Sequence, residues 1–95
     1  MGTNLSADGL LPPDAQRRRL VLFLAQNVAE LRQKAGLTQL QLAVAADLSR
    51  ATVHLIEAGA CDPRLSTVTS LADALGRNAL SLFADPRAQA GLDPL

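Results

Sequence analysis

Two short helical segments, separated by a turn of three residues, constrain the fold of this chain more than any other feature of its sequence. Thr38 is a good helix N-cap, and Gln41 completes a capping box with it, so a helix is predicted at 39–46. Ser49 is the next N-cap, and it predicts a second helix at 50–58. Because so short a turn joins them, the two helices must approach each other closely.

Small and apolar residues stand at the positions that this close approach requires. Ala43 leaves room for the second helix at the contact, and Asp47 tolerates the left-handed backbone of a tight turn better than most residues. Five apolar residues are predicted to anchor the pair to a core: Leu42, Ala46, Leu48, Val53 and Ile56. Two short helices arranged in this way form a helix-turn-helix, whose second helix enters the major groove of DNA.

Longer helical patterns flank the pair. Apolar residues that recur every three or four positions predict a first helix from about Gln16 or Arg17 to Gly36. A similar pattern predicts a fourth helix that stops at Gly76. Residues 79–83 fit either a short strand or a short fifth helix. The sequence therefore predicts an all-α fold, a compact bundle of four to five helices.

Three parts are expected along the chain. Residues 1–16 contain two glycines and a Pro-Pro pair, and we interpret them as a flexible N-terminal tail. Residues 17–77 form the helix-turn-helix domain, and residues 78–95 a short dimerisation element with a C-terminal tail. The formal net charge is zero, but the middle part has eight Lys or Arg against five acidic residues, or +3, which the two ends offset with −2 and −1. This mildly basic domain permits phosphate binding without indicating it.

The sequence contains no recognisable catalytic, metal-binding or membrane-spanning pattern. Cys61 is the single cysteine and His54 the single histidine, which excludes an internal disulfide and a multi-cysteine metal site. No Ser/His/Asp or Cys/His set and no phosphate-binding glycine loop can be recognised. The longest apolar run, residues 20–25, falls far short of the ~20 residues that a bilayer requires. We therefore expect a cytoplasmic protein that is not an enzyme, with no cofactor, no metal and no membrane contact.

The stretch from about Leu24 to Leu82 resembles the lambda-repressor-like family of phage repressors, Cro proteins and their bacterial relatives. The matching positions are Leu37-Thr38-Gln39, Leu42-Ala43, Leu48-Ser49, Val53, Ile56-Glu57, Gly59, Pro63, Leu71-Ala72 and Leu75-Gly76. The resemblance implies a helical bundle that binds double-stranded DNA as a dimer. The sequence departs from the family at Asp47, where relatives often have glycine, and at Ala60-Cys61, where they often have a cation that holds phosphate.

The resemblance also implies which residues contact DNA. Arg50 occupies the position at which relatives read a base, and its guanidinium can pair with O6 and N7 of guanine. A phosphate contact or a solvated charge is the alternative for this residue. Gln39 matches a phosphate-contacting glutamine, and Arg64 either contacts DNA or is a plain surface charge. The complete expected set is Thr38, Gln39, Ser49, Arg50, Ala51, Thr52, His54, Leu55 and Arg64.

Arg32 and Glu57 match family positions that pair between the first helix and the end of the second helix of the motif. We expect a partly buried ion pair that fixes the angle of this recognition helix, which is a structural role.

The leading hypothesis is a sequence-specific transcriptional regulator, either an autoregulating repressor or a restriction–modification controller. It would act as a homodimer on a two-fold operator with half-sites ~34 Å apart. The alternative is an antitoxin-type interaction module that binds a toxin protein and represses its own operon. The extra apolar surface on the first helix (Val21, Leu22 and Phe23), the possible strand at 79–83 and the flexible tails favour this alternative. A second subunit is the first candidate to cover these three residues, and Leu40 and Val44, one helical turn apart, raise the same question.

Overall fold

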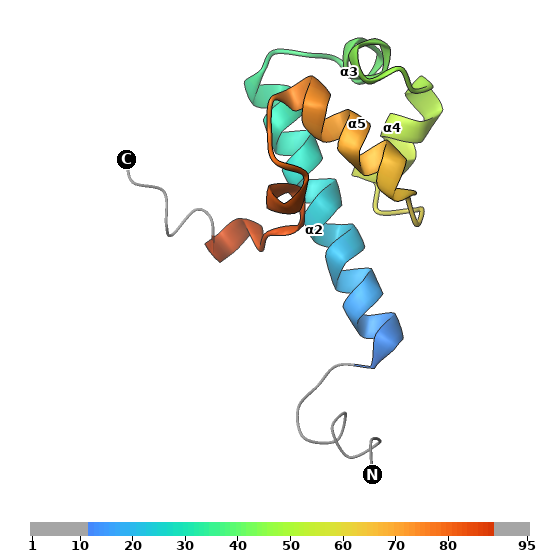
Figure 1. The fold of residues 1–95 in the computed structure, drawn as a ribbon, viewed down its shortest axis with the longest axis vertical. Helices are drawn as coiled ribbons and strands as arrows, with labels where there is room; N and C mark the ends of the chain where they lie inside the picture. Colours follow the sequence, from blue (N-terminus) through green and yellow to red (C-terminus); the bar gives the residue numbers. More distant parts are fainter. Residues whose placement is uncertain (1–11, 89–95) are drawn as a thin grey trace.

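The computed structural model describes residues 12–88, and their regular structure is entirely helical (Figure 1). The elements are, in chain order, α2 (Pro13–Lys34), α3 (Gln39–Ala46), α4 (Arg50–Glu57), α5 (Leu65–Leu75) and the 3-10 helix η1 (Ala79–Phe83). No strand occurs in this part of the chain. The all-α class and the helix-turn-helix formed by α3 and α4 are therefore confirmed.

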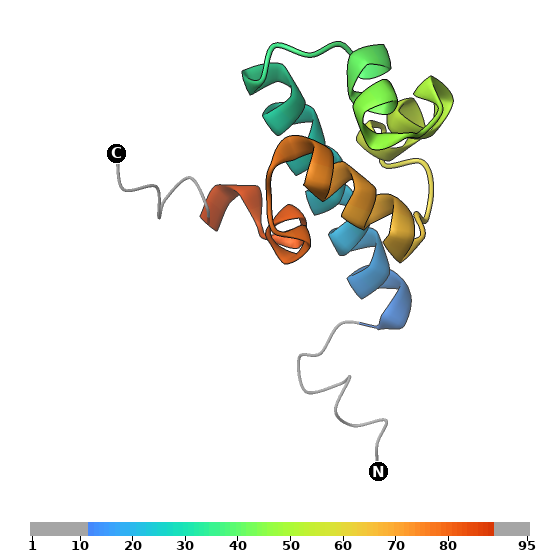
Figure 2. The same ribbon diagram turned by 45° about the horizontal axis from the view of Figure 1, so that its top comes forward.

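Helix α2 forms the long axis of the fold, and the shorter helices pack along it (Figures 1 and 2). Their facing sides enclose one apolar core, to which every helix contributes. Its side chains are at most 2% exposed: Leu24, Val28, Leu42, Ala43, Val53, Ile56, Val68, Leu71, Ala72 and Leu82. The small side chain of Ala43 is buried in this core, as the close approach of α3 and α4 requires.

The local signals that delimit α3 and α4 work as predicted. The hydroxyl of Thr38 accepts the backbone N–H of Gln41, and the Gln41 side chain accepts the N–H of Thr38, so the capping box is complete. Asp47 ends α3 with a left-handed backbone at φ 58°. Ser49 then caps α4 by accepting the N–H of Thr52. The turn between the helices is consequently specified by short-range interactions.

Helix α2 begins earlier than the sequence analysis predicts. The predicted start at Gln16 or Arg17 is wrong, because the helix already includes Pro13. Pro12 takes the N-cap position with an extended backbone, and Pro13 fits the first turn, where a missing N–H costs no hydrogen bond. The rest of the expected flexible tail, residues 1–11, lies outside the described residues.

Residues 79–83 form η1, so the short-strand alternative is wrong and the short-helix alternative is correct. Asn78 caps the turn by accepting the N–H of Leu80. Leu82 points into the core and is 0% exposed, whereas Leu80 is 80% exposed. The spacing of Leu80 and Leu82, two positions apart, also fits the alternation of a strand. It arises instead from a tight helical turn that has one side on α2 and the other in solvent.

A buried asparagine attaches η1 to α2. Asn27 is the buried polar residue of the described part, and its amide nitrogen donates to the carbonyls of Leu82 and Ala84, each at 2.8 Å. Two backbone acceptors that the helix ends leave unpaired are thereby satisfied. The C-terminal segment is consequently fixed on the middle of α2.

Candidate nucleic-acid interface

Helix α4 has one face in the core and one face in solvent. Val53 and Ile56 are fully buried and hold the helix on the domain. The exposed face comprises Arg50, Ala51, His54 and Leu55. An α-helix with its side chains is ~10–12 Å in diameter, which fits the ~12 Å width of the DNA major groove. The exposed face therefore has a size and shape that a major groove can accept.

Arg50 stands at the first position of α4 and is exposed. Among the described residues it has no ion-pair partner, so its guanidinium can bind a ligand without first giving up a carboxylate. Ser49 and Thr52 are differently placed. Their hydroxyls lie 2.8 Å apart and hydrogen-bond to each other. Both side chains thus have a capping role in the free protein.

Arg32 of α2 and Glu57 at the end of α4 form an ion pair. Arg32 Nε lies 2.6 Å from Glu57 Oε2, and Arg32 Nη2 lies 3.1 Å from Oε1. The two side chains are only 14% and 7% exposed. Hydrogen bonding to the Glu57 carboxylate raises the pKa of Arg32 above its usual value. The pair connects the end of α2 to the end of α4.

Two further hydrogen bonds extend the pair to the start of α3. Arg32 Nη1 donates to the carbonyl oxygen of Leu37 at 2.7 Å, and Gln39 Nε2 donates to Glu57 Oε1 at 3.1 Å. Sequence reasoning missed the bond from Gln39 because it joins residues that become neighbours only when α3 and α4 cross. We call Arg32, Leu37, Gln39 and Glu57 the polar network. It fixes the start of α3 relative to α4.

The remaining expected site residues are distributed around α4. Thr38 is exposed at the start of α3 and is occupied as its N-cap. Arg64 occupies the N-cap position of α5 without a capping side-chain bond, is exposed, and has no ion pair within the described residues. Among the described residues, no group of three side chains is suited to hold a metal ion, so His54 does not belong to such a group. Burial, aided by Asp62, raises the pKa of the Cys61 thiol, which keeps it protonated at neutral pH.

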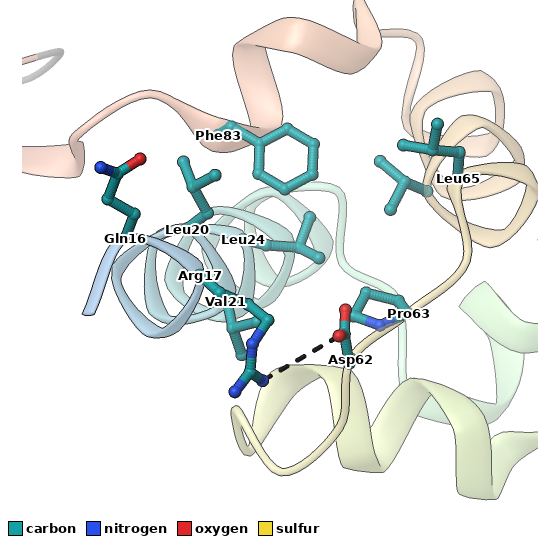
Figure 3. A pocket seen from close by; sticks show the side chains of 10 residues that line it. Gln16, Arg17, Leu20, Val21, Leu24, Asp62, Pro63, Leu65 and Phe83 are labelled. Carbon is teal, nitrogen blue, oxygen red and sulfur yellow. Dashed lines mark ion pairs between the residues drawn. The ribbon is translucent and has the colours of Figure 1, made fainter. Parts of the chain in front are cut away.

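An apolar groove lies away from the exposed face of α4, between the first half of α2, the start of α5 and η1 (Figure 3). Its volume is about 340 Å³. Leu20, Leu65 and Phe83 line it from these three elements. Arg17 and Asp62 face each other at its rim, with 3.9 Å between Nη1 and Oδ2. The groove has apolar walls and a charged edge.

The family comparison agrees with this geometry. The model of a family described as a helix-turn-helix domain matches residues 24–81. The chain belongs to the helix-turn-helix domain family. The matched range begins within α2 and ends within η1, so it contains the core residues except Leu82, and it excludes the first turns of α2.

Two solved structures are similar to the chain over most of its length. A hypothetical transcription factor, NHTF from Neisseria, is 32% identical with a TM-score of 0.73, and the match covers 77% of this chain and 84% of that one. The restriction-modification controller protein C.AhdI from Aeromonas hydrophila is 33% identical with a TM-score of 0.64, over 66% of this chain and 96% of that one. A search of curated proteins gave no match. No helix in the described range is long and apolar enough to cross a membrane.

Proposed function

We propose that this helix-turn-helix protein is a sequence-specific, DNA-binding transcriptional regulator of the lambda-repressor-like type. The observation that carries the proposal is the exposed face of α4, which begins with an unpaired arginine and is held rigidly from behind by core residues and the polar network. A rigid, pre-positioned helix can present side chains to base edges without an ordering cost at binding. The similarity to a transcription factor and a controller protein supports it.

Arg50 is assigned the base-reading role in this proposal. A bidentate contact with O6 and N7 of guanine discriminates against other bases by ~1–3 kcal/mol. Its neighbours on α4 supply contacts of lower specificity. The methyl groups of Ala51, Thr52 and Leu55 suit the C5-methyl of thymine, and His54 is placed for phosphate.

Phosphate contacts are assigned to the edges of the motif. Gln39 uses one side-chain N–H for Glu57, which leaves the amide oriented at the start of α3, where the helix N-terminus favours an anion. Thr38 and Ser49 lie at the two helix starts, and Arg64 lies at the start of α5. Such contacts set the register of the protein on the duplex and carry no sequence information.

We further propose that the protein acts as a homodimer on a two-fold operator. One eight-residue recognition helix reads a short half-site, and a dimer doubles the sequence read, with half-sites ~34 Å apart. Residues 78–95 are the proposed dimerisation element, in which Leu80 is the most exposed large apolar side chain of the described residues. An autoregulating repressor and a restriction–modification controller are the two biological roles that fit such a dimer.

The apolar groove supports one alternative, an antitoxin-type module that binds a toxin protein and represses its own operon. Leu65 is 77% exposed beside the groove, and Val44 is 73% exposed on α3. Co-expression with the product of the adjacent gene decides between the roles. A stable complex with that product favours the antitoxin, whereas a homodimer with unchanged DNA binding favours the regulator alone.

The test of the main proposal is binding to the DNA immediately upstream of the protein's own gene. A mobility-shift titration compares this fragment with a scrambled duplex of equal length, at two salt concentrations. We expect saturable binding with a clear preference for the upstream fragment, and a footprint with two-fold symmetry. Equal binding to both duplexes at both salt concentrations would contradict a sequence-specific regulator.

A further inference from the structure

The first turns of α2 lie outside the family match, yet they pack directly against the loop that follows α4. Gly59 opens this loop with φ at +65°, and a Cβ atom at this position would lie 3.1 Å from Cδ2 of Leu22. Only glycine combines this backbone conformation with such a close approach. The start of α2 is therefore held beside the end of the recognition helix.

A shallow hollow of about 330 Å³ lies at this contact. Its walls are Arg17, Arg18 and Val21 from α2 and residues 59–62 from the loop. The loop contributes no cation, since its residues are Gly59, Ala60, Cys61 and Asp62. Any positive charge at this site must consequently come from α2.

The three consecutive arginines at the start of α2 are not equivalent. Arg17 is occupied, with Asp14 Oδ1 at 3.2 Å and Asp62 Oδ2 at 3.9 Å. Arg19 lies over the ring of Phe23, with 5.7 Å between its guanidinium carbon and the ring centre. Arg18 is exposed at the hollow and has no ion pair within the described residues. It is thus the arginine of the three that can bind an anion without losing a partner.

The position of the hollow indicates which anion this is. The N-terminal residues of a recognition helix contact the base edges, so the opposite end of α4 and the loop beyond it are directed outward, toward the phosphates at the groove edge. We propose that Arg18 binds a phosphodiester of the DNA backbone at this edge, next to the loop at 59–62. This inference rests on the proposed DNA-binding function. It adds a backbone contact from a helix that is not part of the helix-turn-helix.

The test compares Arg18→Gln with Arg19→Gln, which removes the same charge one residue away. Dissociation constants are measured on the upstream fragment and on the scrambled duplex over a series of salt concentrations. Loss of one phosphate contact reduces the slope of log K against log salt by ~0.9, so Arg18→Gln should reduce it by ~1.8 in the proposed homodimer, which loses one contact in each protomer. Between 0.05 and 0.2 M salt, a slope change of this size narrows the difference in affinity between Arg18→Gln and the wild type roughly twelvefold. Arg19→Gln should keep the wild-type slope.

Two further measurements make the result specific. The reduction for Arg18→Gln should be equal on both duplexes, because phosphates carry no sequence information, and Arg18→Lys should restore the slope. Thermal melts should show that all three variants remain folded, since both arginines are exposed. A slope for Arg18→Gln equal to that of Arg19→Gln, or a loss on the upstream fragment alone, would overturn the inference while specific DNA binding stands. If the wild-type protein binds neither duplex, the proposed function and this inference fail together.

Discussion

The two halves of α2 meet the rest of the molecule through different kinds of contact. The C-terminal half buries Leu24 and Val28 in the core, and it also joins α3 and α4 through the polar network, in which one carboxylate receives hydrogen bonds from two side chains. The N-terminal half meets the loop at 59–62, α5 and η1 mainly through apolar side chains, and it leaves a groove open beside Leu20 and Leu65.

This difference suggests a division of tasks. Directional hydrogen bonds allow one geometry, so the polar network suits the part that must hold α4 at a fixed angle. Apolar contacts tolerate rearrangement, so the open groove and exposed leucines suit a surface that associates with another protein chain. Substitutions in the polar network should therefore affect folding, and substitutions on the exposed apolar surface should affect association.

The largest expected effect follows removal of the carboxylate from the polar network. Glu57→Ala leaves the Arg32 guanidinium, which is 14% exposed, without its ionic partner. We expect the free energy of unfolding to fall by about 3–5 kcal/mol. Urea unfolding, monitored by far-ultraviolet circular dichroism, measures the change.

A second ion pair on the same helix provides the control. Lys34 Nζ lies 3.3 Å from Glu30 Oε2, but both side chains are more than half exposed. Glu30→Ala should therefore cost less than about 1 kcal/mol. Similar losses for Glu57→Ala and Glu30→Ala would show that the polar network does not hold the motif together.

The next effect concerns the buried hydrogen bonds from Asn27 that join α2 to η1. Asn27→Ala removes the donor from the carbonyls of Leu82 and Ala84. We expect a loss of about 2 kcal/mol and faster amide hydrogen exchange in η1, with little change in α4. The exposed neighbour Gln26→Ala is the control. Faster exchange throughout the domain would instead mean that Asn27 supports the whole fold.

A smaller effect is expected at the cap of the recognition helix. Ser49→Ala removes the acceptor of the Thr52 N–H and should cost about 1 kcal/mol. Ser66→Ala, exposed in the first turn of α5, has no such bond and should be nearly neutral. Thermal unfolding measures the change in stability of Ser49→Ala and of its control, Ser66→Ala. A neutral Ser49→Ala would mean that packing of Val53 and Ile56 alone fixes α4.

The smallest effect on folding is expected at Leu80. Because this side chain is 80% exposed, Leu80→Ser should change the free energy of unfolding of the monomer by less than about 0.5 kcal/mol. It should nevertheless weaken self-association, measured by sedimentation equilibrium. Leu40→Ser, at a residue that is 55% exposed on α3, is the control. Dissociation caused only by Leu40→Ser would place the dimer contact on the motif and away from η1.

The features that follow from short stretches of sequence are the ones that could be predicted. The capping box of Thr38 and Gln41 and the left-handed turn at Asp47 depend on residues no more than four positions apart, so their geometry is local. The ion pair between Arg32 and Glu57 was anticipated from a family resemblance and could not have come from local pattern.

The features that sequence reasoning missed depend on contacts between distant residues or on ambiguous residue types. Asn27 is polar in an otherwise apolar environment, and its partners lie 55 and 57 residues away. The bond from Gln39 to Glu57 also spans two helices. Pro13 falls within the predicted tail, although proline is favoured in a first helical turn. These three features can be recognised only when the packing of the helices is known.

The central claim, that the exposed face of α4 reads DNA sequence through Arg50, is tested most directly by comparing Arg50→Ala with Arg77→Ala. Both residues are exposed and lack ion pairs in the described part of the chain, and each substitution removes one charge. The measured quantity is the ratio of affinities for the upstream fragment and the scrambled duplex. Arg50→Ala should lower this ratio by about 5- to 150-fold for each half-site, the equivalent of ~1–3 kcal/mol per lost contact, while Arg77→Ala leaves it unchanged. An unchanged ratio for Arg50→Ala would contradict the claim and reduce Arg50 to a backbone contact.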